Sequence, residues 1–173
     1  MKKLLLACAA LTLATTACFV DPPATPPTGG NWATCPTAAV GQVQVAIVTE
    51  GVPNPAYEVV CVVVPDGANG FDALNARAAR LGTTPLRFNG AFLCAIDNAP
   101  LPPTCGTDPA GPLGFSYWSY WDGGSAWSEY SVGAADVELH QGDVEGWKYG
   151  TWDFATTFPT APAHSASFAT LTS

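Results

Sequence analysis

Hydrophobic and polar positions alternate along the first part of the folded region. Residues 41–50 (GQVQVAIVTE) are rich in valine and place an apolar side chain at nearly every second position. This period of two is typical of a strand with one face in a core. The segment GVPNP then turns the chain, and residues 56–65 (AYEVVCVVVP) predict a second strand. The two strands are therefore expected to pair as a hairpin.

A helical period follows over residues 69–82 (NGFDALNARAARLG). Asn69 suits the N-cap of this helix, and Gly82 stands where a helix ends. Arg77 and Arg80 are expected to form a solvated face rather than an anion site. The apolar residues lie three or four positions apart, which places them on one helical face: Phe71, Leu74, Ala78 and Leu81.

Short apolar and aromatic runs after the helix predict several more strands. They cover residues 85–88, 91–97, 115–121, 126–132, 136–140 and 143–150. A single helix across one face of a mixed sheet buries the apolar surfaces of both elements. The pattern therefore predicts an α+β domain with extra short hairpin strands, followed by a mostly irregular tail over residues 154–173.

The N-terminus has the pattern of an export signal. Two lysines precede a short apolar run and a small-residue end, and the run is too short to span a bilayer. The residues before Cys18 are similar to a bacterial lipoprotein signal, although Thr15 replaces the usual leucine. We therefore expect a signal peptide at 1–17, a lipidated Cys18 and a Pro/Thr/Gly-rich tether at 18–34. The alternative is ordinary signal cleavage and a secreted protein.

The charge of the chain excludes one class of partner. There are 14 acidic residues and six Lys and Arg, and two of those six, Lys2 and Lys3, lie in the predicted signal. A mature chain with so few cations cannot neutralise phosphates, which excludes nucleic acid as a partner. An anionic membrane surface would also repel it, so the N-terminal lipid is the expected membrane contact.

The cysteines agree with export. Besides Cys8 and Cys18, the chain contains Cys35, Cys61, Cys94 and Cys105, which allow two disulfides in three connectivities. Cys94 and Cys105 bracket a Pro-rich loop that a local disulfide would close, and this leaves Cys35 to pair with Cys61. A zinc site is the alternative, but it lacks a close C-x-x-C pair. No metal is expected.

Three motifs in a fixed order resemble a known family. They are VPDGANGFDAL, the aromatic strand YWSYW and the closing GDVEGWKYG. Together they resemble the transcobalamin-like C-terminal domain, a β-grasp-like module, over residues 43–150. The order FLCAID, Cys, YWSYWDG and GDVEGW is similar to a bacterial secreted and lipoprotein branch with a Cys pair before its Tyr-Trp strand. The resemblance implies a β-grasp-like mixed sheet with one helix on one face of a domain spanning 35–153.

The same resemblance bears on the dense aromatic stretch at residues 114–133. In a strand, Tyr117 and Trp121 share one face, and Trp118 and Tyr120 share the other. The Trp-x-aromatic pair of the family matches Trp118 and Tyr120, and its last strand contains Trp147, so we expect these three in the core. The remaining rings surround a Gly-Gly turn on faces that the helix leaves open, and they are the candidate ligand-binding residues: Tyr117, Trp121, Trp127 and Tyr130.

Catalytic motifs are absent from the sequence. His140 and His164 are the only histidines, and no G-x-S-x-G elbow or phosphate-binding loop occurs. No cofactor is expected. Acids at period-two spacing suggest either a calcium site or a solvated hairpin, and the solvated hairpin is favoured because no EF-hand loop accompanies them: Asp136, Glu138, Asp143 and Glu145.

The sequence thus predicts a non-enzymatic, extracytoplasmic ligand-binding module. The resemblance implies that it captures a small molecule of corrinoid-like type and passes it to an importer. The family's eukaryotic members hold cobalamin between this domain and a helical domain, so the resemblance also implies a partner protein. The alternative is a cell-envelope interaction protein that binds glycan or another surface protein through its aromatic patch.

Overall fold

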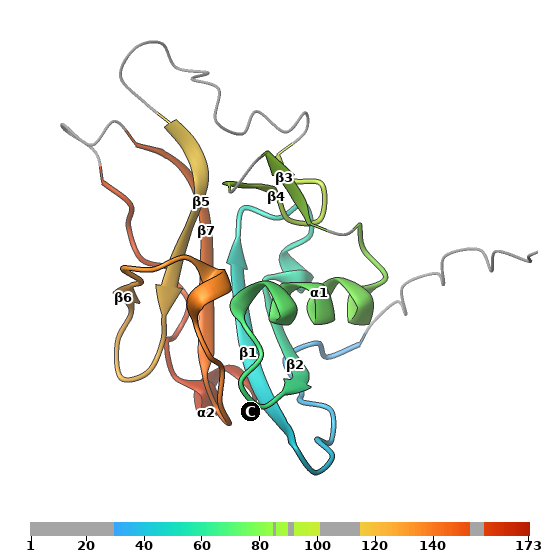
Figure 1. The fold of residues 1–173 in the computed structure, drawn as a ribbon. Helices are drawn as coiled ribbons and strands as arrows, with labels where there is room; N and C mark the ends of the chain where they lie inside the picture. Colours follow the sequence, from blue (N-terminus) through green and yellow to red (C-terminus); the bar gives the residue numbers. More distant parts are fainter. Residues whose placement is uncertain (1–29, 85, 90–91, 101–114, 153–157) are drawn as a thin grey trace, which may run out of the picture.

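A five-stranded mixed sheet forms the centre of the protein. The computed structural model describes residues 30–84, 86–89, 92–100, 115–152 and 158–173. The strand order is β2-β1-β7-β5-β6, with β1 and β7 parallel and the other neighbours antiparallel. Helix α1 lies across one face, and a separate β3–β4 hairpin lies above the helix in the view of Figure 1. The predicted α+β class with one main helix on the sheet is confirmed.

The first hairpin and the helix follow the sequence pattern closely. Strands β1 (Gln42–Glu50) and β2 (Val59–Pro65) are joined by a 3-10 turn, η1 (Pro55–Tyr57). Helix α1 (Gly70–Leu81) begins after Asn69, whose side chain accepts hydrogen bonds from the amides of Phe71 and Asp72. It ends at Gly82, which has a positive φ of 64° that glycine adopts without strain.

The later strands are fewer than the pattern predicted. They are β3 (Arg87–Asn89), β4 (Phe92–Ala95), β5 (Phe115–Asp122), β6 (Ser128–Glu129) and β7 (Val144–Trp152). The strand expected at 136–140 does not form. A 3-10 turn, η2 (Ala134–Asp136), precedes this segment, and buried Leu139 exchanges backbone hydrogen bonds with Gly67 and Ala68. The tail at 158–173 is irregular except for α2 (Phe168–Leu171).

The main core lies between α1 and the sheet. Valines and isoleucine from β1 and β2 meet Leu74 and Leu81 of the helix, and all of these side chains are buried. Trp118 and Trp147 are buried in the same cluster, which confirms their expected place in the core. Tyr120 is half-buried and packs against the cluster.

Arg77 corrects the expectation of a solvated arginine face. Its side chain is 0% exposed, and its guanidinium bonds Asp97 (2.8 Å), the Thr49 hydroxyl (3.0 Å) and the Tyr57 carbonyl (2.7 Å). Arg77 follows Leu74 by three positions, so it lies on the buried stripe of the helix. Its charge is compensated there by a buried carboxylate and two oxygen acceptors.

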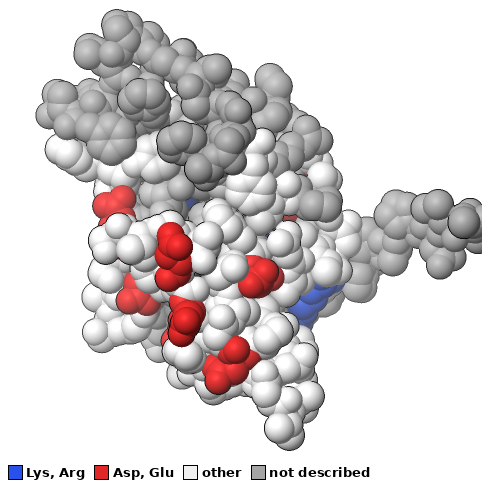
Figure 2. All heavy atoms as spheres, viewed as in Figure 1, with Lys and Arg blue, Asp and Glu red and all other residues white. Residues whose placement is uncertain are grey.

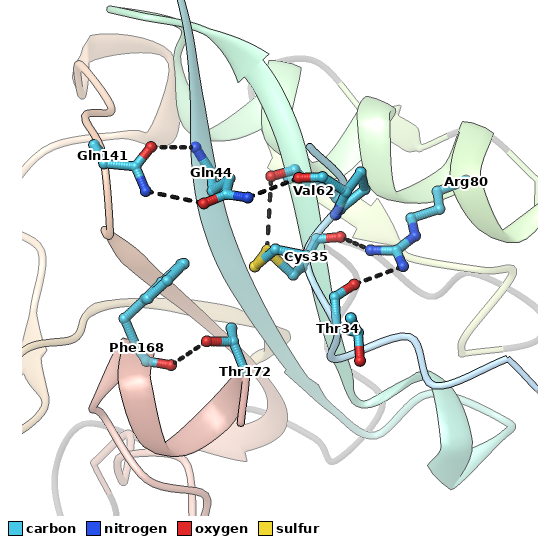
Figure 3. The surroundings of a disulfide bond; sticks show 10 residues. Thr34, Cys35, Gln44, Val62, Arg80, Gln141, Phe168 and Thr172 are labelled. Atoms are coloured by element: carbon cyan, nitrogen blue, oxygen red, sulfur yellow. Dashed lines mark hydrogen bonds between the residues drawn. A yellow bond between two sulfur atoms is a disulfide. The ribbon is translucent and has the colours of Figure 1, made fainter. Parts of the chain in front are cut away.

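Arg80 is also not free on the surface. Its guanidinium lies 5.6 Å from the Trp32 ring centroid and donates to the carbonyls of Cys61 and Thr34. Figure 3 shows this contact beside the Cys35 disulfide. The helix is thereby tied to the segment that precedes β1.

The predicted disulfide between Cys35 and Cys61 is confirmed. It fixes the N-terminal segment to β2, and the Cys61 amide donates to the Trp32 carbonyl at 2.9 Å. Trp32 is buried in the main core, so the folded domain includes residues that the sequence assigned to the tether. Such a bond is typical of an oxidising, extracytoplasmic compartment.

Other N-terminal and cysteine predictions lie outside the described residues. These are the signal at 1–17, the lipidated Cys18 and the partner cysteine Cys105. Cys94 is disulfide-bonded. No helix in the described part of the chain is long and apolar enough to cross a membrane.

Candidate functional site

The aromatic stretch divides between the two faces of the sheet, as the strand period predicts. Trp118 and Tyr120 of β5 point to the side that α1 covers. Ser119 and Trp121 lie on the opposite side, where the indole nitrogen of Trp121 donates to the Ser119 hydroxyl at 2.8 Å. The two faces therefore have to be considered separately.

On the α1 face, four aromatic rings form a continuous stack. Tyr130 lies on Tyr120 with centroids 4.2 Å apart, and Tyr120 lies on Trp147 at 4.3 Å. Phe71 of α1 continues the stack at 6.1 Å from Trp147. Tyr130 is half-buried and forms the outer end of this stack, which we call the aromatic stack. Ring pairs of this kind add to the stability that burial alone gives.

Glu145 of β7 lies beneath the outer end of the aromatic stack. Its carboxylate accepts hydrogen bonds from the Tyr120 hydroxyl and from the Tyr130 hydroxyl, the latter at 2.9 Å. The Tyr130 hydroxyl also lies 3.4 Å from Asp122, the cross-strand neighbour of Glu145. The Glu145 side chain is 0% exposed, which corrects the expectation that it belongs to a solvated acidic hairpin.

Burial dominates the ionisation of this cluster. Desolvation raises the pKa of Glu145 to about 7, with Asp143 and Asp122 adding to the rise, while the two tyrosine hydrogen bonds oppose it. Desolvation and the Glu145 charge likewise raise the pKa of Tyr120 and of Tyr130. A carboxyl with this pKa exchanges its proton near neutral pH.

The C-terminal segment covers the opposite face of the sheet. We call residues 158–173 the C-terminal strap. Leu171 and Phe168 pack on Ala46, Val48 and Val144, next to Trp127. The Trp127 indole donates to the His164 carbonyl at 2.8 Å. The tail that the sequence expected to be irregular is therefore part of a second core.

Two glycines let the strap approach this face closely. A Cβ at Gly146 would lie 2.6 Å from the Trp127 ring and 3.0 Å from both Pro162 and Trp121. A Cβ at Gly123 would lie 2.9 Å from the Ala166 carbonyl oxygen. Neither position has room for a larger residue, so the strap and the sheet are complementary in shape.

Polar groups of the sheet hold the backbone of the strap. Glu50 accepts hydrogen bonds from the amides of Ala163 and His164, and the His164 ring nitrogen lies 3.2 Å from the same carboxylate. Lys148 donates to the Ala161 carbonyl at 2.9 Å and pairs with Glu50 at 3.3 Å. Burial raises the pKa of Glu50, but the hydrogen bonds and Lys148 outweigh it, so the net pKa is lowered.

The four candidate ligand-binding residues do not form one wall. Trp121 is 7% exposed beneath the strap, which corrects the expectation that the helix-free face leaves it open. Trp127 is half-buried on the same face. Tyr117 is half-buried, and its pKa is raised to about 12 by desolvation and the charge of Glu129. Tyr130 alone of the four belongs to the aromatic stack.

The surface around the outer end of the stack is acidic. Figure 2 shows acidic side chains gathered over the start of α1, η2 and the β5–β6 edge, with few basic side chains between them. The exposed acids of these elements are Asp72, Asp122, Glu129 and Asp136. Among the described residues, no group of His, Cys, Asp and Glu side chains is arranged to hold a metal ion.

No protein-family model matches the chain, and no curated protein matches it at a significant level.

Glu145 is the site residue that the sequence reasoning missed. It alternates with Trp147 and Tyr149, and the period of two places all three on the α1 face. That period could have identified Glu145 as buried, but its charge and its acidic neighbours suggested a solvated position.

The burial of each tryptophan predicts how much its truncation to alanine lowers the free energy of unfolding. Trp121→Ala should lower the free energy of unfolding by roughly 3–5 kcal/mol, as should Trp118→Ala, because both side chains lose buried contacts. Trp127→Ala should cost less, since this side chain is only half-buried. Chemical denaturation of the three variants checks the order. A Trp121→Ala variant as stable as the wild type would contradict the covered face.

The raised pKa of Glu145 predicts that the stability of the protein depends on pH. Its folded pKa of about 7 lies above its ordinary value of 4.5, so its contribution to stability is present below pH 4.5 and is lost as the pH rises through 7. When the pH is raised from 5 to 8, the ionisation of Glu145 should lower the free energy of unfolding of the wild type by roughly 2–3 kcal/mol.

The matched variant for this measurement is Glu145→Gln, which cannot ionise. Denaturation at several pH values should show that this loss is absent from the variant. The difference between the two proteins isolates Glu145 from other titrating groups, such as His140 and Glu50. Equal pH dependence in both proteins would show that Glu145 ionises freely in the folded state.

Proposed function

We propose that this chain is a non-enzymatic, extracytoplasmic module that binds a small ligand at the outer end of the aromatic stack. The observation that carries the proposal is the half-exposed ring of Tyr130, which Tyr120 and Glu145 hold in a fixed orientation. A ring held in place loses little conformational freedom when a flat ligand stacks on it. The Cys35–Cys61 disulfide supports the extracytoplasmic setting.

The ligand class comes from the resemblance to the transcobalamin-like family. We propose a corrinoid-like compound, delivered to an importer together with a partner protein that closes the other side of the ligand. The aromatic stack supports a ligand with a broad apolar face, because Tyr130 contributes ring area rather than a charged group. The acidic surroundings disfavour an anionic ligand.

A second candidate function is a cell-envelope protein that binds glycan or another surface protein. The specific observation in its favour is the exposed apolar side chain of Val132, two residues from Tyr130 and 50% accessible. A half-exposed ring with an apolar neighbour also suits the flat face of a sugar.

Ligand titration separates the two functions. Cobalamin added to the purified full chain should quench tryptophan fluorescence, and Tyr130→Ala should weaken the binding about thirtyfold, the loss of roughly 2 kcal/mol typical of an aromatic anchor. Tyr117→Ala is the matched control, because Tyr117 is a half-buried tyrosine on the opposite face. The affinity of the Tyr117→Ala variant for cobalamin should equal that of the wild type.

Two other results of the ligand titration would change the proposed function or the proposed site. No response to cobalamin, together with a Tyr130-dependent response to an envelope polysaccharide, would favour the second function. Equal losses in Tyr130→Ala and Tyr117→Ala would refute the location of the site.

We propose that Cys18 is lipidated and anchors the mature protein to a membrane. Cys18→Ser should move the protein from the membrane fraction to the soluble fraction without changing its thermal midpoint, because the buried residues of the described domain begin at Trp32, well after Cys18. Cell fractionation followed by immunoblotting checks this. A wild-type protein found wholly in the medium would instead indicate ordinary signal cleavage.

A further inference from the structure

The short edge segment at residues 124–133 is held to the sheet by one aromatic ring on each face. Trp127 packs on the strap face, and Tyr130 packs on the α1 face. Strand β6 contributes only two paired residues, Ser128 and Glu129. Beyond them, the Tyr130 amide donates to the Tyr120 carbonyl at 3.1 Å, and residues 131–133 are exposed. Between Trp127 and Ala134, which is buried in the main core, Tyr130 is the aromatic side chain that attaches this segment to the α1 face.

Tyr130 is attached to a carboxyl that has no cation beside it. The groups that interact with Glu145 are Tyr120 and Asp122 of β5, Tyr130 after β6, and Asp143 before β7. Helix α1 packs against Tyr120 at Gly70, and Ala134 of η2 packs on α1 beside the same glycine. The nearest acids in sequence to these two positions are Asp72 and Asp136.

The basic groups of these same elements are engaged elsewhere. Arg77 of α1 pairs with Asp97, and Arg80 donates to Cys61 and Thr34. His140, in the segment before β7, pairs with Asp66 at 2.9 Å on the surface. Lys148 lies on the strap side of β7 and pairs with Glu50. Within the described chain, an ionised Glu145 would thus be a buried charge without a counter-ion.

We propose that Glu145 is a proton-operated latch for residues 128–133. The neutral carboxyl keeps Tyr130 on the aromatic stack. Loss of the proton releases Tyr130 and opens Tyr120 and Trp147 to water, where the carboxylate becomes hydrated. Gly124 and Gly133 stand at the two ends of residues 124–133, and a Cβ at either would meet no contact shorter than 3.8 Å, so neither end is tightly packed.

The direction of the response follows from linkage. Tyrosine hydroxyls bond an ionised carboxylate more strongly than a neutral one, but desolvation outweighs this gain and raises the pKa of buried Glu145 to about 7. In the open state the carboxyl is exposed to water, and its pKa returns toward 4.5. The ratio of closed to open molecules should therefore fall by roughly fiftyfold between pH 5 and 8.

This inference does not depend on the proposed function, because the latch is tested without a ligand. Hydrogen exchange of the Tyr130 amide in the full chain reports the closed state, since this amide is bonded to Tyr120. Its protection factor, corrected for the intrinsic exchange rate at each pH, should fall at least tenfold as the pH rises through 7. The Cys61 amide lies in β2, at the opposite edge of the sheet from β6, and donates to the Trp32 carbonyl. Its protection factor should not change with pH.

Variants identify Glu145 as the titrating group. Glu145→Gln should keep the Tyr130 protection constant from pH 5 to 8. Asp122→Asn removes a negative charge that raises the pKa of Glu145, so the midpoint should move to lower pH. Asp136→Asn is the matched control, because this exposed acid is not among the groups that act on Glu145, and its midpoint should equal that of the wild type.

Three results would overturn the latch. The first is a Tyr130 protection that is constant with pH in the wild type, and the second is an equal fall in Glu145→Gln. The third is a parallel fall at Cys61, which would mean global unfolding. If Glu145→Gln does not fold, the Asp122→Asn midpoint still decides, because an unchanged midpoint excludes Glu145 as the group.

Discussion

The parallel pairing of β7 with β1 is the interaction on which the rest of the structure depends. It places the last strand in the middle of the sheet, so both faces of β7 must be covered. The side chains of Trp147 and Tyr149 point to the α1 face. The side chain of Val144 points to the strap face, and Gly146 leaves room on that face for Trp127 and Pro162. One helix cannot cover two faces, and the C-terminal strap therefore becomes a structural element although it contains almost no regular secondary structure.

Two buried ionisable groups on the α1 face, Arg77 and Glu145, have different kinds of hydrogen-bond partner. Arg77 is fully buried, but Asp97 neutralises it and two further oxygens accept its hydrogen bonds. Glu145 is equally buried and receives only neutral hydroxyl donors. The first arrangement holds the helix to the turn that contains Asp97 through a pair of opposite charges. The second responds to pH near neutrality, which makes the edge beside Tyr130 the adjustable part of this face.

Local patterns predicted the elements whose signals lie within one segment. The period of two in β1 and β2 and the capping signals of α1 gave their boundaries within about three residues. The cysteine count allowed three connectivities, and pairing Cys94 with Cys105 left the Cys35–Cys61 bond that the structure contains. Long-range packing was not accessible in this way. Nothing near Trp121 indicates that residues more than forty positions later cover it, and the burial of Arg77 and Glu145 depends on partners from other elements.

Two carboxyls on opposite faces respond to pH in opposite directions. Glu50 has a lowered pKa, so its contribution to holding the strap is present above its ordinary value of 4.5 and is lost as the pH falls through its folded pKa. Glu145 has a raised pKa, and the state it stabilises is lost as the pH rises toward 7. The two groups belong to different clusters and contact different segments. The α1 face can therefore open at its edge while the strap stays in place, so a change in pH alters the aromatic stack without exposing the second core.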